Sequence, residues 1–263
     1  MSAGARNLDD TLNSFPTPST LPLALPVSHV SIARWFDGIA KSGYLEPTFC
    51  KLFGEELVYL FYGGVFYRPN NKPTQNASEL PIAFVFSPRL LAQIARFYPF
   101  DTGALATGRF GLWSTTLTPL LNDFKVNGDH HHTVPRRMIY HLFSSNESYL
   151  HGKPDPNSKG KPYPLPELFD FYSADITGLG VDHRQCIIEC QTPKPVPLRD
   201  ELLWVGFPES MTREFANLCE WMAPLIPQYY AYESHRITVP SEMTAKLEEI
   251  ARQEVIKRYT RLR

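Results

Sequence analysis

The stretch Leu57-Val-Tyr-Leu-Phe-Tyr-Gly-Gly64 combines β-branched, aromatic and aliphatic residues and ends at two glycines. This composition is typical of a buried strand that stops at a turn. A second run of the same kind, Pro81-Ile-Ala-Phe-Val-Phe86, ends at Ser87-Pro88. We therefore predict two buried strands, over 57–62 and 81–86, with a polar loop between them.

Other elements are predicted on both sides of this pair. Apolar residues at 32, 35, 36 and 39 recur at helical spacing, with Ser31 placed to cap the helix and Gly43 to end it. Residues 1–25 lack periodicity and are expected to form a flexible N-terminal arm. Further strands are predicted over 185–191 and 202–206, and further helices over 89–96, 117–124, 167–174 and, at the C-terminus, 241–263.

Proline is unusually frequent, with 24 among 263 residues, about twice the usual share of roughly 5%. Because proline lacks a backbone donor and interrupts helices, this density favours short strands and loops over a helical bundle. We predict an α+β fold, a single domain over 26–263 with a twisted, mostly antiparallel, split β-sheet flanked by helices.

Charge and cysteine content narrow the class of protein. Lys and Arg number 26 against 27 Asp and Glu, so a polyanion would have to meet a local basic patch. The four cysteines form no C-x-x-C pair, and reduced thiols are the simplest interpretation. No apolar stretch approaches the roughly 20 residues of a membrane-spanning helix. We expect a soluble, cytoplasmic protein without a membrane partner.

One ordered set of residues suggests a function. His29-Val-Ser31 precedes the first predicted helix, which ends in Gly43-Tyr-Leu45, and Tyr67-Arg68 follows the strand over 57–62. A histidine before a helix cap is, by itself, more often structural. In this order, however, the elements resemble the N-terminal half of ADP-ribosyltransferases, especially the DarT-like branch that modifies nucleic acid. The resemblance covers 27–87 and the strand around Glu189.

The resemblance implies NAD as substrate and a catalytic site that contains Glu189, Arg68 and His29. Cleavage of the bond between ribose and nicotinamide builds positive charge on the sugar, which a fixed carboxylate such as Glu189 stabilises. A histidine that donates to a ribose and an arginine paired with phosphate would hold the dinucleotide. The expected NAD-binding residues are His29, Ser31, Tyr62, Tyr67, Arg68, Asp101 and Thr102, with Tyr62 or Tyr67 stacked on nicotinamide.

Glu189 lies in the predicted strand Ile187-Ile-Glu-Cys-Gln191. Strand alternation places it on the same face as Ile187 and Gln191. Carboxylates are seldom buried without a partner, so a buried Glu189 would point to a functional site. An edge strand whose Glu189 faces water is the alternative, and the two stay open here.

The sequence departs from the DarT-like pattern at one position. In that pattern the NAD-binding arginine directly follows the aromatic-glycine turn, which here falls at Gly64 or Val65, whereas Arg68 lies a few residues later. Two hypotheses follow. The chain is an active transferase, acting as a toxin or defence effector under a restraining partner protein, or an inactive scaffold of the same fold that binds a nucleotide, nucleic acid or partner.

Two segments, one polar and one basic, are candidates for binding an acceptor, expected to be DNA or RNA. Asp182-His183-Arg184 precedes the strand of Glu189, and the resemblance implies that this loop contacts the acceptor. Arg136 and Arg137 follow the run Asp129-His-His-His132 and form a local basic element that suits a phosphate backbone. A solvated loop is the simpler interpretation of that run.

Other chemistries fit poorly. The three adjacent histidines of 130–132 point in different directions, so no metal site is predicted. Asp101-Thr102-Gly103 has no second copy, which an aspartic protease needs. The simpler interpretation is a turn in which Asp101 bonds its own backbone and Gly103 has a positive φ. Neither a Gly-x-Ser-x-Gly elbow nor a Walker-type loop is present.

Overall fold

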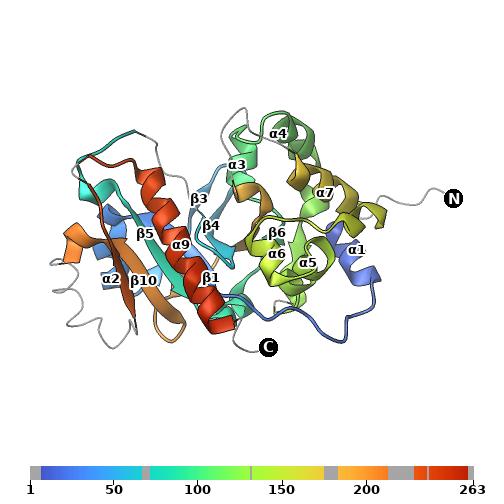
Figure 1. Cartoon of the computed structure of the whole chain (residues 1–263), viewed down its shortest axis with the longest axis horizontal. Coiled ribbons are helices and arrows are strands. Elements are labelled where there is room, and N and C mark those ends of the chain that lie inside the picture. The colour runs from blue at the N-terminus through green and yellow to red at the C-terminus, as the bar shows by residue number, and fades with distance from the viewer. Residues whose placement is uncertain are drawn as a thin grey trace. The chain divides into compact units, whose positions relative to one another are not determined.

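The computed structural model divides the chain into two compact units, which we call unit 1 (residues 1–24, 51–54 and 92–191) and unit 2 (25–50, 55–91 and 192–263). Both contain strands and helices (Figure 1). The predicted α+β class with mostly antiparallel strands is confirmed. The domain boundary at residue 26 stays a prediction. The structure describes residues 7–66, 72–130, 132–174, 183–212, 228–235 and 237–259.

Unit 2 is built on a sheet in which neighbouring strands are antiparallel, apart from the parallel pair β10 and β11. The predicted strands over 57–62, 81–86 and 202–206 are confirmed within two residues at each end. A separate two-stranded sheet pairs β2 (Tyr44–Leu45) with β9 (Val196–Pro197). The order of the main sheet is β11 (Tyr229–Tyr232), β10 (Leu202–Pro208), β5 (Pro81–Phe86), β1 (Val27–Ile32), β4 (Glu55–Tyr62) and β3 (Thr48–Cys50).

Helix α9 (Pro240–Tyr259) covers one face of this sheet. Its Leu247 and Ala251 are buried against Val85 and Trp204. Burial of a leucine such as Leu247 contributes about 1.5–3 kcal/mol, so the helix is part of the core of unit 2. The predicted C-terminal helix is thus confirmed over 240–259.

The helix predicted to start at Ser31 begins later. Ser31 lies in β1, where its backbone pairs with Ile82 of β5, so the prediction that Ser31 caps a helix is wrong. A 3-10 turn at Ala33–Trp35 leads into α2 (Phe36–Ser42). The predicted end is confirmed, because Gly43 adopts a φ of 75° that suits glycine and its N–H bonds Ile39.

The described residues of unit 1 form three short strands and several small helices. β6 (Arg96–Tyr98) pairs antiparallel with both β7 (Val126–Asn127) and β8 (Ile188–Thr192). Phe171 lies at the centre of an aromatic cluster, 5.8 Å from the ring of Phe100 and 5.3 Å from that of Phe110. The α-helices are α1 (Leu8–Ser14), α3 (Thr102–Ala106), α4 (Leu112–Leu117), α5 (Val134–Leu142), α6 (Asn146–Leu150) and α7 (Leu165–Ser173).

The predicted flexible N-terminal arm differs from the structure at α1. Leu8 and Leu12, one helical turn apart, are buried, and Asn7 caps the helix by accepting a hydrogen bond from Asp10. Arg137 of α5 donates to the carbonyl of Leu12. Seven residues are too few to show helical periodicity convincingly, which is why the sequence pattern missed this element.

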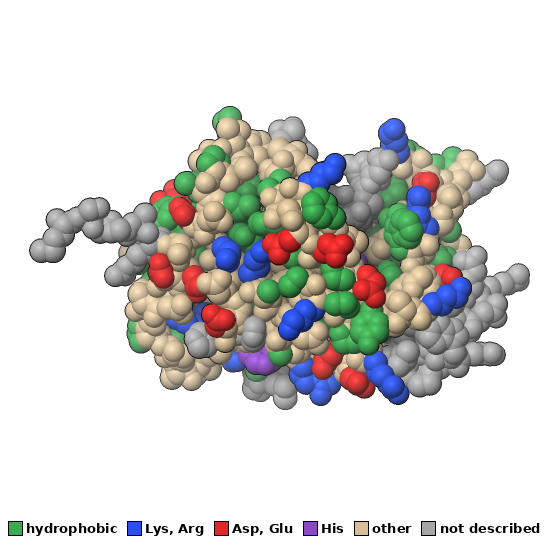
Figure 2. All heavy atoms as spheres, turned by 180° about the vertical axis from the view of Figure 1, so that it is seen from behind, with side chains coloured by type: hydrophobic (Ala, Val, Ile, Leu, Met, Phe, Trp, Pro, Cys, Tyr) green, Lys and Arg blue, Asp and Glu red, His purple; other side chains and the backbone are tan. Residues whose placement is uncertain are grey.

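Two surface properties of the described residues bear on the sequence predictions. Among the helices that the structure describes, none combines the length and hydropathy needed to cross a bilayer. On the face shown in Figure 2, the described acidic and basic side chains are interspersed. This distribution agrees with the net charge of -1.

His141 of α5 should make the protein sensitive to acid. Its side chain is buried and stacks on Phe15, with ring centroids 4.4 Å apart. Burial, with repulsion from Lys161 and Arg137, lowers the pKa of His141 to about 4. The unfolded chain therefore takes up this proton first, and stability falls as pH drops from about 6.5 to about 4.

We expect His141→Gln to reduce this acid-dependent loss of unfolding free energy by about 1–2 kcal/mol, after allowance for solvent screening. Chemical denaturation at several pH values between 4 and 7 measures it. The exposed His151 of the same unit provides a control as His151→Gln. An unchanged acid slope in His141→Gln would contradict the assignment.

Candidate functional site

Glu189 is buried on β8, with 1% of its surface exposed. It lies opposite Tyr98 of β6 in the antiparallel register. The amide of Gln191 donates to Glu189 Oε1, so the two side chains share a face of the strand, as alternation predicted. The alternative of a water-facing Glu189 is excluded.

Three hydrogen bonds hold the Glu189 carboxyl group. The backbone N–H of Thr102 donates to Oε2 at 3.0 Å, and the Thr102 hydroxyl donates to Oε1 at 2.7 Å. Gln191 provides the third donor. Because all three partners donate, they favour the ionised form of the carboxyl.

Asp101 and Thr102 reach Glu189 because they begin helix α3. Asp101 is the N-cap, and its side chain accepts a hydrogen bond from the N–H of Ala104 at 2.7 Å. The predicted bond of Asp101 to its own backbone is therefore confirmed. The predicted positive φ of Gly103 is wrong, since Gly103 is a helical residue; a Cβ there would lie 3.2 Å from Asp101 Oδ1.

Burial and the neighbouring Asp101 raise the pKa of Glu189 to about 8, and the hydrogen bonds from Thr102 and Gln191 oppose the rise. Glu189 is thus mostly protonated at neutral pH and ionises just above it. A carboxyl group that changes charge in this range can exchange a proton or stabilise a cation.

Gln191 and Arg96 extend the hydrogen-bond network around the Glu189 carboxyl group. Gln191 Nε2 also donates to Thr102 Oγ1 at 3.3 Å, while its Oε1 accepts from Arg96 Nε at 2.5 Å. The Arg96 guanidinium lies over the ring of Phe53, 4.4 Å from the centroid. We call Glu189, Asp101, Thr102, Gln191 and Arg96 the carboxyl cluster; all belong to unit 1.

His29 and Ser31 lie on β1 of unit 2, two residues apart and on one face of the strand. His29 Nδ1 bonds the Tyr59 carbonyl at 2.8 Å, and burial lowers the pKa of His29. The ring is therefore neutral, Nδ1 carries the proton, and Nε2 is an acceptor. The expectation that His29 donates to a ribose is corrected accordingly.

Tyr62 differs from its expected role. It is fully buried in unit 2, and its hydroxyl accepts from the N–H of Leu25 at 2.8 Å. Its ring is therefore part of the core and is not available to stack on nicotinamide. Tyr67, Arg68 and Asp182 lie outside the described residues, and of His183 and Arg184 the structure describes only the backbone, at the start of a 3-10 turn.

Arg136 and Arg137 both contact the N-terminal segment of unit 1. Arg136 donates to the carbonyl of Pro22 at 2.6 Å. Arg137 is buried and donates to Asn13 Oδ1 at 3.1 Å. Their guanidinium groups hold this segment in place, so these contacts give no support to the acceptor-binding role predicted for them.

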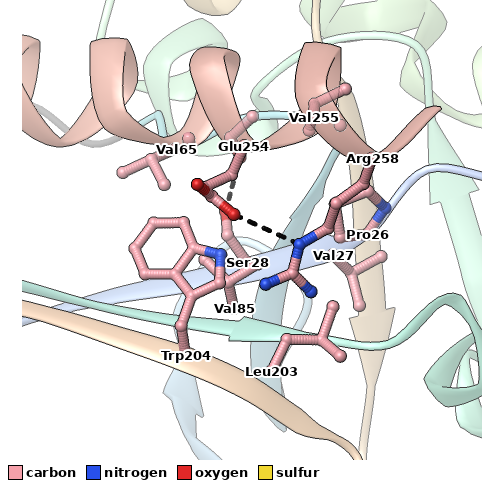
Figure 3. Close-up of a pocket in the computed structure, with 13 residues that line it drawn as sticks. Pro26, Val27, Ser28, Val65, Val85, Leu203, Trp204, Glu254, Val255 and Arg258 are labelled. Carbon is pink, nitrogen blue, oxygen red and sulfur yellow. Dashed lines mark hydrogen bonds and ion pairs between the residues drawn. The ribbon is translucent and has the colours of Figure 1, made fainter. Parts of the chain in front are cut away.

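Among the pockets formed by described residues, two belong to unit 2. The first, between α9 and the sheet (Figure 3), contains an ion pair of Arg258 and Glu254 at 3.2 Å beside Ser28 and Trp204. Its room of about 10 Å³ suits one water molecule. The second, of about 250 Å³, is lined mainly by hydroxyl and amide side chains of exposed loops, among them Asn76. Within the described ranges, no three His, Cys, Asp or Glu side chains are arranged to hold a metal ion.

Comparison with known proteins finds similarity at the level of structure alone. No protein-family model and no curated protein matches the chain. Among solved structures, it is similar to the DarT of Thermus sp. 2.9 in complex with NAD+, with a TM-score of 0.41 and 11% identity over 81% of this chain and 98% of that one. At these values the likeness leaves the activity to be argued from the residues.

The structure thus groups the predicted site residues in two sets. Glu189, Asp101 and Thr102 come together in unit 1, and His29 and Ser31 share a strand of unit 2. Sequence reasoning missed Gln191 and Arg96 as members of the carboxyl cluster. Alternation had placed Gln191 beside Glu189, and this was the available signal for it.

Proposed function

We propose that the chain is an NAD-dependent ADP-ribosyltransferase in which Glu189 is the catalytic carboxylate. The supporting observation is the buried Glu189 carboxyl, fixed by Thr102 and Gln191 and poised to ionise near pH 8. The sequence resemblance independently assigns the same residue. The proposed acceptor is nucleic acid, and such an enzyme would act as a toxin or defence effector under a restraining partner.

The proposed reaction replaces one bond at the ribose anomeric carbon with another. The bond to nicotinamide breaks, and nicotinamide leaves with the electron pair. The acceptor atom then bonds the same carbon and releases a proton to solvent. Ionised Glu189 would stabilise the cationic sugar between these events. With a pKa of about 8, about a tenth of Glu189 is ionised at pH 7, so the rate should rise toward pH 8.

Other residues are proposed to bind the substrates. His29 Nε2 would accept from a ribose hydroxyl and Ser31, on the same face, would add a hydroxyl; Arg68 would pair with the pyrophosphate. Asp182, His183 and Arg184 are proposed to contact the acceptor. We do not extend this role to Arg136 and Arg137, because both bind the N-terminal segment.

One observation favours a second candidate, a non-catalytic scaffold. Both oxygens of Glu189 are already hydrogen-bonded inside unit 1, with 1% of the residue exposed. In that case the carboxyl group serves to fix the start of α3 on β8. The scaffold would bind a nucleotide, nucleic acid or protein without cleaving NAD.

Nicotinamide release from NAD distinguishes the two candidates. The purified protein is incubated with NAD, alone and with single-stranded DNA, RNA or protein, beside Glu189→Gln and the matched control Glu147→Gln, an exposed carboxylate of the same unit. A transferase gives release that depends on one acceptor, is lost in Glu189→Gln and is retained in Glu147→Gln. No release, with no heat of NAD binding in calorimetry, would exclude the enzyme and leave the scaffold.

A further inference from the structure

We propose that Arg96 is a positioning residue that orients the amide of Gln191, so that Gln191 donates to Glu189 and supports its ionised form. The inference rests on the proposed function for its catalytic meaning. Its geometry lies entirely within unit 1 and involves β6 and β8.

The antiparallel register sets Arg96 directly opposite Gln191. Their side chains meet through Arg96 Nε and Gln191 Oε1 at 2.5 Å, a charge-assisted hydrogen bond. The ring of Phe53 lies beneath the guanidinium at 4.4 Å and restricts its movement. Arg96 is therefore held from two directions.

The orientation of a glutamine amide decides whether a neighbouring group faces a hydrogen-bond donor or an acceptor, because the NH2 group donates and the carbonyl oxygen accepts. Since Arg96 occupies Oε1 of Gln191, Nε2 must face Glu189 and Thr102. The reversed amide would set its carbonyl oxygen against Glu189 Oε1 and its NH2 group against the N–H donor of Arg96. Arg96 thus excludes the orientation that would repel an ionised Glu189.

The other titratable groups around Glu189 do not provide this support. Asp101, at the start of α3, opposes ionisation by its negative charge. Cys190 on the same strand is buried, and burial with the nearby Glu189 raises the pKa of its thiol. Tyr98 lies opposite on β6. Arg96 is the cation that the hydrogen bonds of the carboxyl cluster connect to Glu189.

The first test is the pH dependence of nicotinamide release. In Arg96→Met, which keeps an unbranched chain as far as the Nε position but has neither the charge nor the donor, we expect the midpoint of the rising limb to move up by about 0.5–1 pH unit. The rate at pH 7 would then fall about three- to tenfold and recover at higher pH. Arg96→Lys, which retains a positive charge, should keep the midpoint close to its wild-type value. The exposed Arg109→Met should leave the midpoint unchanged.

The second test does not depend on NAD chemistry. Carbon-13 NMR of protein labelled at the glutamate side-chain carboxyl follows the titration of Glu189, assigned by loss of its signal in Glu189→Gln. The same upward shift in Arg96→Met would support the positioning role even if the protein released no nicotinamide. Should Arg96→Met not fold, Gln191→Met, which removes the amide itself, is titrated in its place.

A purely structural Arg96 predicts a different result. Arg96→Met would then lower the melting temperature while the midpoint of Glu189 titration stayed at its wild-type value. That outcome would overturn the proposal. Absence of nicotinamide release in the wild type, with the NMR shift present, would reject the proposed function alone.

Discussion

Glu189→Gln is expected to remove a loss of stability that the wild-type protein undergoes between about pH 4.5 and pH 8. The folded pKa of Glu189 is raised to about 8 from an ordinary 4.5. The unfolded chain therefore releases this proton first as pH rises, and folding becomes less favourable. The slope in this range is at most about 1.4 kcal/mol per pH unit.

Urea denaturation at intervals from pH 4 to 9 measures this effect as the difference in slope between wild type and variant. Comparison of slopes is preferable to a single pH, because the Gln amide also changes the hydrogen bonds to Thr102 and Gln191. Glu147→Gln, exposed on α6, should retain the wild-type slope. Parallel curves for wild type and Glu189→Gln would show that the carboxyl group has the same pKa in the folded and the unfolded states.

Gly206→Val is expected to destabilise unit 2 strongly, and Gly206→Ala to cost about 1–3 kcal/mol through overpacking. Gly206 lies on β10, where a Cβ would approach Leu247 Cδ2 to 2.5 Å and Trp204 to 3.2 Å. Leu247 is fully buried, so its methyl group can move only into packed neighbours. The absence of a side chain at 206 is what lets α9 lie this close to the sheet. Thermal and urea unfolding measure the loss.

The cause can be separated from a general effect of replacing glycine. Gly38 of α2 is exposed, with nothing within 4 Å of an added Cβ, so Gly38→Ala should stabilise by about 0.5–1 kcal/mol. In a Leu247→Ala background the cost of Gly206→Ala should largely disappear, because the clashing methyl group is gone. An equal loss of stability from Gly206→Ala in the wild-type and Leu247→Ala backgrounds would show that the strain does not come from contact with Leu247.

The pattern of apolar residues in the sequence correctly predicted the strands whose side chains are buried. Alternation at 187–191 placed Glu189 and Gln191 together, and the aromatic run at 81–86 became β5, buried at every position. The start of the first helix was misplaced because Ser31 is a good cap chemically, whereas β5 offers its backbone a strand partner. A partner distant in the sequence outweighed the local preference.

The carboxyl cluster shows why the site could be predicted only in part. Thr102 and Glu189 are 87 positions apart, and no spacing rule connects a helix start with a strand at that separation. Their contact depends on how β6 leads into α3 and pairs with β8. Arg96 is likewise an ordinary polar residue until the register sets it opposite Gln191. The residue types predicted a catalytic carboxylate, whereas the pairing of strands distant in the sequence determined which residues surround it.

The division of unit 2 into distant segments has a consequence for synthesis on the ribosome. Residues 92–191, the largest part of unit 1, emerge before β10, β11 and α9. Until residues 240–259 have left the exit tunnel, the apolar face around Val85 has no helix to cover it. A nascent chain at that stage presents an aggregation-prone surface of the kind that chaperones bind. The order of translation thus leaves unit 2 as the last part to complete its core.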